Sequence, residues 1–223
     1  MGIPVLIIGE SGSGKTYSIK NLNPEKVGIF LCEKNRLPFR KKFPTYKVRN
    51  MRKEEDGKVT VYRQSVVIQS LLRSKKKDEL KKILVIDDSQ YIMANEYFDR
   101  ASEKGYDKFV DIGANFRNLV HLVNDELPDD VIVYFLHHPE TDSNTGRQKA
   151  KTIGKMLDEK LTLEGCFDIV LHARTDGQEH WFSTQSDGTD TAKSPEEMFE
   201  EKIPNDLAFV DKTIREYYGM EEI

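Results

Sequence analysis

The chain has 223 residues, 38% of them hydrophobic, and its 34 Lys and Arg against 38 Asp and Glu give a net charge of -4. That length suits one large α/β core, so we expect a single domain over residues 1–223. The charge excludes a globally basic nucleic-acid protein, although local basic segments can still contact phosphate. No apolar run approaches the length of a membrane span, and we expect no membrane partner.

The cysteines indicate a reducing compartment. Cys32 and Cys166 are isolated in apolar surroundings and lack metal-ligand spacing. The first apolar run begins almost at residue 1 and leaves no room for a signal peptide. We therefore expect a cytoplasmic protein with buried thiols.

Apolar runs typical of strands alternate along the chain with segments of helical periodicity or composition. The predicted strands are Ile3–Ile8, Val27–Cys32, Ile83–Ile86, Val131–Leu136 and Phe167–Leu171. The predicted helices are Lys15–Leu22, Ser65–Ser74, Ser89–Glu103, Ala114–Asn124, Lys155–Leu163 and Asp206–Tyr218. This alternation predicts an α/β fold in which a mostly parallel sheet is sandwiched by helices.

Two segments predict β-hairpin insertions. Between Tyr46 and Tyr62, β-rich stretches flank a turn at residues 54–57, and a second hairpin is expected through His180–Thr184 with a turn at residues 186–188. Asn205 and Asp206 are expected to cap the last helix, because their side chains accept bonds from free N–H groups.

Residues 9–16 read Gly-Glu-Ser-Gly-Ser-Gly-Lys-Thr and match the phosphate-loop pattern G-x-x-x-x-G-K-[ST], directly after the first predicted strand. Such glycines let backbone N–H groups curl around phosphate oxygens, and a helix beginning near Gly14 points its positive end at them. We expect Lys15 to reach the β- and γ-phosphates and the Thr16 hydroxyl to ligate Mg²⁺. The pattern thus predicts a P-loop fold with ATP and Mg²⁺ as cofactors, bound by Gly9, Ser11, Gly12, Ser13, Gly14, Lys15, Thr16 and Tyr17.

Polar side chains follow three of the predicted strands. Asp87 follows Ile83–Ile86, Glu33 follows Val27–Cys32, and His137 and His138 follow Val131–Leu136. Asp87 can accept a bond from Thr16 or hold a Mg²⁺-bound water, so it is the expected second half of the phosphate site and a metal-site residue. The histidines have no carboxylate or cysteine cluster at ligand spacing, which argues against a metal site of their own.

Two basic segments predict contacts with nucleic acid. The polar stretch after His138 contains Arg147, Lys149 and Lys151. A second tract, Lys34–Lys53, interleaves lysines and arginines with Phe39, Phe43 and Tyr46. Positive charge follows a nucleic-acid backbone while aromatic faces stack bases, which is the combination for binding single strands. The alternative is solvated charge with the aromatic rings in the core.

With these motifs the chain resembles the phage-encoded RecA-like ATPases of the AAA-type P-loop class, which are associated with single-strand annealing and recombination. The resemblance rests on Gly9–Thr16 and Ile83–Asp87, with weaker support from Lys151–Asp158, Leu163–Phe167 and Asp190–Pro195. It implies a RecA-like fold, an oligomeric ATPase of a phage-infected bacterial cytoplasm, and single-stranded DNA as partner, with a single-strand-binding protein as a further candidate.

The resemblance also implies roles for individual residues. Glu33 stands where RecA-like proteins carry the general base, and Asp88 is the rival, because other ATPases place that carboxylate directly after the metal-binding Asp. His138, with His137 as the alternate, stands at the position of a γ-phosphate sensor. Arg147, Lys149 and Lys151 follow it, where RecA-like proteins have a mobile DNA-binding loop. Lys193 is a candidate finger that reaches a neighbouring subunit's γ-phosphate.

Two other functions stay open at the level of sequence. One is a small-molecule kinase of the P-loop class, although the candidate lid around Arg147 has more lysine than the arginine-rich lids of such kinases. The other is a non-catalytic nucleotide-dependent switch, in which Glu33 has no chemical role.

Overall fold

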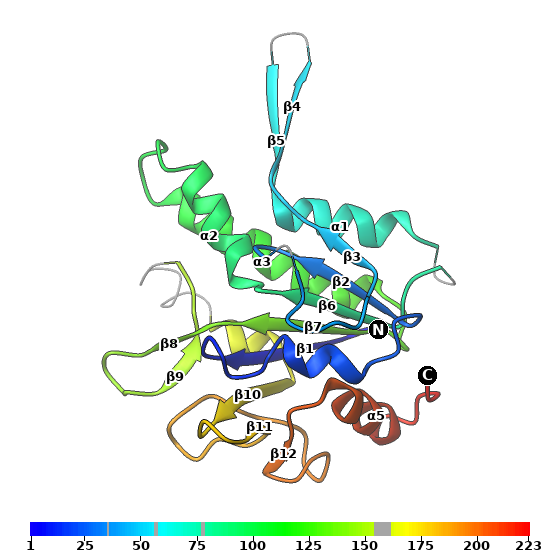
Figure 1. The fold of residues 1–223 in the computed structure, drawn as a ribbon. Coiled ribbons are helices and arrows are strands. Elements are labelled where there is room, and N and C mark those ends of the chain that lie inside the picture. Colours follow the sequence, from blue (N-terminus) through cyan, green and yellow to red (C-terminus); the bar gives the residue numbers. More distant parts are fainter. Residues whose placement is uncertain (35, 56–57, 77–78, 154–161) are drawn as a thin grey trace.

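The computed structural model describes residues 1–34, 36–55, 58–76, 79–153 and 162–223. Among these residues, eight strands form one sheet in the order β12-β11-β10-β1-β7-β6-β2-β3 (Figure 1). The strands from β10 to β3 pair in parallel, whereas β11 and β12 are antiparallel. Their bounds are β1 Ile3–Gly9, β2 Val27–Leu31, β3 Thr45–Lys47, β6 Ile83–Asp87, β7 Ile132–His137, β10 Ile169–Thr175, β11 His180–Ser183 and β12 Lys202–Pro204.

Helices cover both faces of the sheet. The helices α1 (Gln64–Ser74), α2 (Gln90–Asp99) and α3 (Asp107–Glu126) pack on one face, and η1 (Tyr17–Asn21) and α5 (Leu207–Tyr217) pack on the other. Successive residues of β1 belong to opposite core clusters, with Leu6 on the first face and Val5 on the second. The continuous apolar runs are therefore strands buried on both sides, as predicted. No helix of the described residues is long and apolar enough to cross a bilayer.

The predicted helix Lys15–Leu22 is wrong in type and length. Only Tyr17–Asn21 is helical, as a five-residue 3-10 helix in which Leu22 N donates to Ile19 O at 3.0 Å. Pro24 disfavours helical backbone at the residue before it, and β2 begins soon afterwards at Val27. The phosphate loop is thus followed by one tight turn instead of a full α-helix.

The insertions differ from expectation in part. β4 (Met51–Glu55) and β5 (Lys58–Tyr62) form the predicted first hairpin, which projects from the body (Figure 1). Its turn at residues 56–57 lies outside the described residues, and Tyr46 belongs to β3 of the main sheet. The second hairpin is only partly as predicted: His180–Ser183 forms the antiparallel strand β11, which pairs with β10 and with β12, but residues 186–188 are part of a long connection from β11 to β12 and not a tight turn between them. β8 (Pro139–Thr141) and β9 (Gln148–Ala150) form a hairpin that was not predicted.

The other helix predictions hold with shifted ends. α3 begins at Asp107, seven residues before the predicted start, and α2 ends at Asp99 instead of Glu103. Asp206 caps α5 as predicted, because its carboxylate accepts from Ala208 N at 2.9 Å. The predicted helix Lys155–Leu163 falls almost entirely outside the described residues, and the short 3-10 turn η2 (Leu163–Cys166) follows it.

Two histidines of the parallel strands are buried, His137 on β7 and His172 on β10. Burial lowers the pKa of each imidazole from 6.5 to about 4. Below pH 6.5 the unfolded chain binds protons at these positions that the folded chain does not bind until about pH 4. The free energy of unfolding that each contributes is therefore fully present above that window and is lost as pH falls through it.

We expect His137→Gln to weaken this pH dependence, because the glutamine amide does not titrate. One such histidine accounts for a slope of about 1.4 kcal/mol per pH unit within the window. Urea unfolding of both proteins at several pH values measures the two slopes. Since carboxyl groups titrate in both proteins, only the difference is informative, and equal slopes would contradict a neutral, buried His137.

Candidate nucleotide site

The phosphate loop follows β1 and requires its glycines. A Cβ at Gly9 would lie 2.6 Å from Ser13 Oγ and 2.8 Å from the Ala173 carbonyl. Gly12 and Gly14 have φ of 84° and 94°, which disfavour other residues. Two of the motif's fixed glycines therefore stand where the neighbouring backbone or a positive φ excludes a side chain.

Lys15 lies inside the loop. Its Nζ donates to the carbonyls of Gly9 and Glu10, the latter at 2.9 Å. Burial lowers the pKa of Lys15 to about 8, against the opposing influence of Asp88 and Asp87. The ammonium is therefore a largely desolvated cation in the cradle of the loop, where it attracts phosphate more strongly than it would in water.

Thr16 and Asp87 meet across the sheet. Thr16 Oγ1 donates to Asp87 Oδ1 at 2.8 Å, the contact expected from the sequence. Burial, with Asp88 nearby, raises the pKa of Asp87 to about 6. Its second oxygen, Oδ2, is buried and accepts no hydrogen bond within the described part of the chain. A hydroxyl beside a carboxylate with an unpaired oxygen fits Mg²⁺, which takes few protein ligands beside water and phosphate.

Asp88, the next residue, contacts two side chains that line the same site. It has a φ of 60°, unusual for a residue with a side chain, and its carboxylate is buried. Lys34 Nζ lies 3.2 Å from Oδ2 and His138 Nε2 lies 3.3 Å from Oδ1. Burial acts to raise the pKa of Asp88, but the bonds from His138 and Lys34 outweigh it and hold the pKa below its usual value. The carboxylate is therefore ionised at neutral pH.

Glu33 lies two residues beyond the end of β2 and does not belong to the lining of the pocket over the phosphate loop. Its side chain is exposed and accepts from Asn95 Nδ2 of α2 at 3.4 Å. The pocket over the loop, about 330 Å³, is instead lined by the following basic residues Lys34 and Arg36. His138, on the other side, also lines this pocket.

The two adjacent histidines have different surroundings. His137 is enclosed, with Nδ1 2.8 Å from Ser89 Oγ and Nε2 2.8 Å from the Lys151 carbonyl. Because a carbonyl only accepts, Nε2 carries the proton and Nδ1 accepts from Ser89. Both nitrogens are used in the core, whereas His138 reaches Asp88 and the phosphate pocket. Of the two sensor candidates, only His138 has access to a nucleotide.

Two of the three basic residues after the sensor position have partners within the chain. Arg147 donates to the Asp190 carbonyl through Nε at 3.2 Å, and Lys149 lies 3.4 Å from Glu140. Lys151 is exposed and points into a second cleft. Lys193, the finger candidate, is exposed and its backbone pairs with Val170 of β10.

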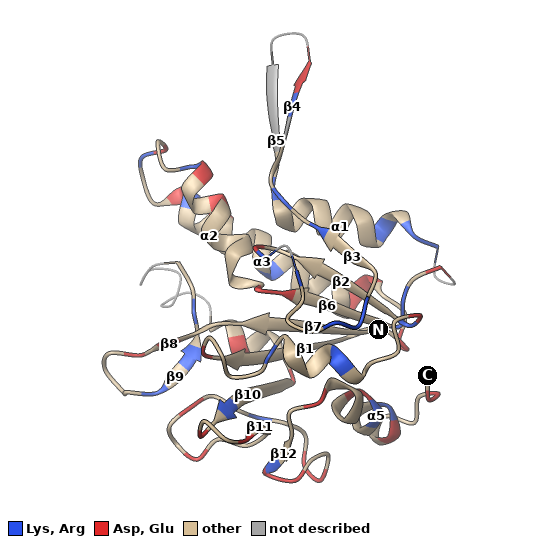
Figure 2. Ribbon diagram, in the orientation of Figure 1, with Lys and Arg blue, Asp and Glu red and all other residues tan. Residues whose placement is uncertain are grey.

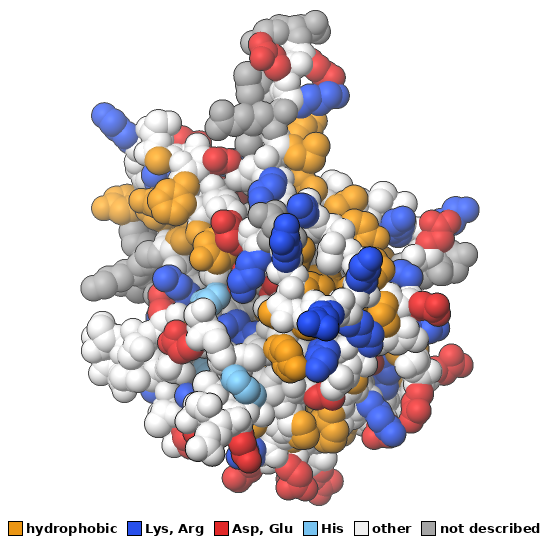
Figure 3. Space-filling view, in the orientation of Figure 1, with side chains coloured by type: hydrophobic (Ala, Val, Ile, Leu, Met, Phe, Trp, Pro, Cys, Tyr) orange, Lys and Arg blue, Asp and Glu red, His pale blue; other side chains and the backbone are white. Residues whose placement is uncertain are grey.

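The basic tract Lys34–Lys53 combines exposed charge with rings that are partly buried or exposed. Phe39 and Phe43 pack against the second core cluster, and Tyr46 stacks on Phe30. The exposed cations of the loop between β2 and β3 are Lys34, Arg36, Arg40, Lys41 and Lys42. Lys and Arg mark the loop in Figure 2 and gather near the centre of the face in Figure 3. Phe39 and Phe43 are thus partly buried against the core, whereas Tyr46 is 39% exposed.

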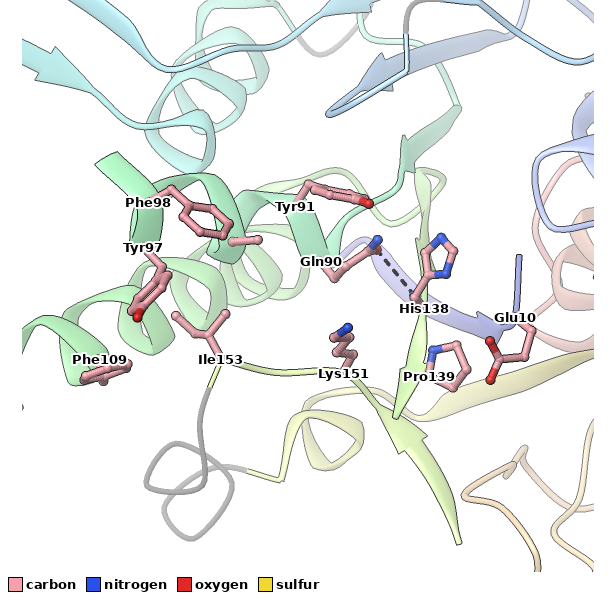
Figure 4. A pocket seen from close by; sticks show the side chains of 11 residues that line it. Glu10, Gln90, Tyr91, Tyr97, Phe98, Phe109, His138, Pro139, Lys151 and Ile153 are labelled. Atoms are coloured by element: carbon pink, nitrogen blue, oxygen red, sulfur yellow. Dashed lines mark hydrogen bonds between the residues drawn. The ribbon is translucent and has the colours of Figure 1, made fainter. Parts of the chain in front are cut away.

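The second cleft, about 720 Å³, adjoins the phosphate pocket and shares Glu10 and His138 with it. Aromatic side chains lie at its far end, Glu10 and His138 lie at its near end, and Lys151 stands between them (Figure 4). The rings at the far end are Tyr97, Phe98 and Phe109, and a fourth ring, Tyr91, lies nearer to His138. Phe98 is 70% exposed, which is unusual for so large an apolar side chain.

Sequence reasoning missed three groups of the site. Lys34 and Arg36 line the phosphate pocket, and His180 and Asn205 contact the phosphate loop from the carboxyl-terminal part of the chain. The aromatic cleft was missed as well. The basic run had marked Lys34 and Arg36 only as nucleic-acid candidates, and no local pattern distinguishes His180 or Asn205.

A mostly parallel sheet between helices, with this loop and carboxylate at the ends of β1 and β6, defines a P-loop NTPase. The sequence profile of AAA domains matches residues 1–197, and the chain belongs to this family. The family consists of ATPase-type nucleotide-binding proteins, and its members generally bind ATP with Mg²⁺, the cofactors predicted from the sequence. No curated protein matched the sequence.

We expect Lys15→Ala to weaken ATP binding about 100-fold, because it removes a charge-assisted contact to phosphate. Calorimetric titration of MgADP and of MgATP measures the loss. Lys20→Ala is the matched control, since Lys20 is an exposed lysine of η1 whose Nζ donates to the Tyr17 hydroxyl at 2.8 Å. Equal affinities for Lys15→Ala and wild type, with unchanged thermal unfolding, would contradict the assignment.

Proposed function

We propose that the protein hydrolyses ATP with Mg²⁺ and couples hydrolysis to single-stranded DNA. The observation that carries the first half is the Thr16–Asp87 contact, 2.8 Å long, with the second Asp87 oxygen unpaired and Lys15 beside it. In this proposal Thr16 and Asp87 hold Mg²⁺, which when bound supplies positive charge against the phosphate oxygens. Lys15 binds the β- and γ-phosphates.

Asp88 is the stronger candidate for the general base. Its carboxylate is ionised, buried and fixed by Lys34 and His138, both of which line the phosphate pocket. A base must lie within hydrogen-bond reach of the attacking water, and this position is adjacent to Asp87. Glu33, exposed and turned toward Asn95, would need a rearrangement to reach that water. His138 links Asp88 to the γ-phosphate end of the pocket and suits the sensor role.

Isosteric amides separate the two candidate bases. We expect Asp88→Asn to bind ATP normally but to hydrolyse it about 10² to 10⁴ times more slowly, because an amide cannot accept the proton of water. Glu33→Gln should hydrolyse ATP at close to the wild-type rate. Single-turnover hydrolysis with parallel binding titrations gives both quantities. Slow hydrolysis by Glu33→Gln together with normal hydrolysis by Asp88→Asn would assign the general base to Glu33. A wild-type protein that binds ATP but does not hydrolyse it would instead indicate a non-catalytic nucleotide-dependent switch.

The second half of the proposal places a single strand of DNA in the aromatic cleft. Exposed aromatic rings stack on bases of any sequence, and a cation nearby neutralises backbone phosphate. Phe98 and Lys151 supply these two features within one cleft (Figure 4). Because the cleft shares His138 and Glu10 with the phosphate pocket, a bound strand and the γ-phosphate would contact the same side chains. A role in recombination, annealing or replication agrees with this proposal.

The placement of the basic residues refines which of them contact DNA. Arg147 and Lys149 have intramolecular partners, so their removal would first loosen the β8–β9 hairpin. We therefore propose Lys151 as the DNA contact of this segment, joined by the exposed cations of the β2–β3 loop. A homo-oligomer, with Lys193 acting on a neighbouring subunit, stays a prediction.

Two substitutions distinguish charge from stacking. Lys151→Ala should weaken oligonucleotide binding and flatten the dependence of log affinity on log salt by about 0.7. Phe98→Ala should weaken binding about tenfold, within the usual range for one lost stack, and leave the salt slope unchanged. Fluorescence anisotropy of a labelled single strand at several salt concentrations measures both effects.

Lys212→Ala is the control, because this exposed lysine lies on α5 and pairs with Glu216 at 3.5 Å, away from the cleft. Basal hydrolysis should survive in all three variants. Wild-type affinity and slope in Lys151→Ala and Phe98→Ala would exclude the cleft as the DNA site. Failure of the wild-type protein to bind single-stranded DNA would contradict the proposed DNA partner but not the proposed ATP hydrolysis.

A further inference from the structure

The carbonyl of Ser13 in the phosphate loop receives two side-chain donors from the carboxyl-terminal part of the chain. His180 Nδ1 lies 3.1 Å from this oxygen, and Asn205 Nδ2 donates to it at 3.3 Å. His180 begins β11, and Asn205 stands between β12 and α5. Because a carbonyl only accepts, His180 must carry a proton on Nδ1. Two side chains distant in sequence therefore converge on one backbone oxygen.

The loop is in close contact with both side chains. A Cβ built on Gly14 would lie 3.0 Å from Asn205 Nδ2 and 3.1 Å from His180 Nδ1. At the other end of the segment, Asn21 donates to Asp206 at 2.9 Å. The intervening helix η1 has only five residues, too few to hold its position by its own hydrogen bonds. The carboxyl-terminal segment thus contacts the chain on both sides of Lys15, at Ser13 in the phosphate loop and at Asn21 at the end of η1.

The Ser13 carbonyl and the Gly14 N–H belong to one planar trans peptide, so they point in opposite directions. Holding the carbonyl against His180 and Asn205 therefore aims the Gly14 N–H the other way. Gly14, with a φ of 94°, lacks the side chain that would resist rotation of this peptide. In a phosphate loop the N–H groups at this position must face the phosphates.

We propose that His180 and Asn205 are positioning residues of the nucleotide site, which lock the Ser13–Gly14 peptide with its N–H toward the phosphates. This inference rests on the proposal that the loop binds ATP. The lock requires a hydrogen-bond donor at each of the two positions, and it makes the carboxyl-terminal part of the chain, at His180 and Asn205, part of the nucleotide site. Neither residue needs to touch the nucleotide for the lock to act.

Substitutions that keep or remove the donor test the lock. His180→Asn retains an amide N–H at the position of Nδ1, whereas His180→Ala removes it. Asn205→Asp keeps the shape of the side chain but offers an acceptor to the Ser13 carbonyl. We expect the Kd for MgADP and the KM for ATP to rise about tenfold in His180→Ala and in Asn205→Asp, with kcat much less affected.

His180→Asn should bind nucleotide within about twofold of wild type, a rescue that general loss of packing would not produce. Glu179→Ala is the matched control, because Glu179 is the exposed neighbour of His180 and its carboxylate pairs with Lys202 at 3.4 Å. Thermal unfolding of each variant checks the fold.

The outcomes separate this inference from the proposed function. A wild-type protein that binds neither MgADP nor MgATP would overturn the proposed function, and the lock with it. Normal binding by wild type together with normal binding by His180→Ala and Asn205→Asp would overturn the lock alone. So would a loss in His180→Ala that His180→Asn fails to restore.

Discussion

The hydrogen bond from Thr16 to Asp87 joins the ends of two strands that are not neighbours. β7 lies between β1 and β6, so the bond spans a third strand and depends on all three being in register. It brings a hydroxyl and a buried carboxylate together at the carboxyl edge of the sheet, where a parallel arrangement collects strand ends. His138, which follows β7, is placed beside this pair for the same reason.

Beside that bond, the buried carboxylate of Asp88 has partners on both of its oxygens, whereas one oxygen of Asp87 has none in the described part of the chain. Asp88 adopts a backbone conformation that costs free energy, and its ion pair with Lys34 and its contact with His138 offset the burial of its charge. His138 lies between the phosphate pocket and the aromatic cleft. One side chain therefore contacts the proposed base and lines both proposed binding sites, which provides a direct route for coupling nucleotide state to a bound strand.

Local patterns predicted much of the fold and the core of the site. The five strands and the phosphate loop were recognised because strands buried on both faces give continuous apolar runs and the loop has glycines at fixed spacing. The helix after the loop was misjudged, because Pro24 and the early start of β2 outweigh the helical composition of Lys15–Leu22. The partners of β11 were misjudged as well: a turn at residues 186–188 was expected to define its pairing, but β11 pairs with β10 and with the distant β12. A turn pattern in the sequence does not show which strands lie beside each other in the sheet.

The sequence by itself determined that a strand leads into a phosphate loop and that Lys15, Thr16 and Asp87 belong to one site, because these residues act through short-range backbone geometry and strand ends. Tertiary structure alone decided that Asp88 is buried against Lys34 and His138, which line the pocket, whereas Glu33 is exposed beside Asn95. It also decided that Arg147 is tied to Asp190 and that His180 and Asn205 contact the Ser13 carbonyl. Those outcomes depend on which side chains the packing of distant segments brings within a few ångströms, and no spacing along the chain encodes that proximity.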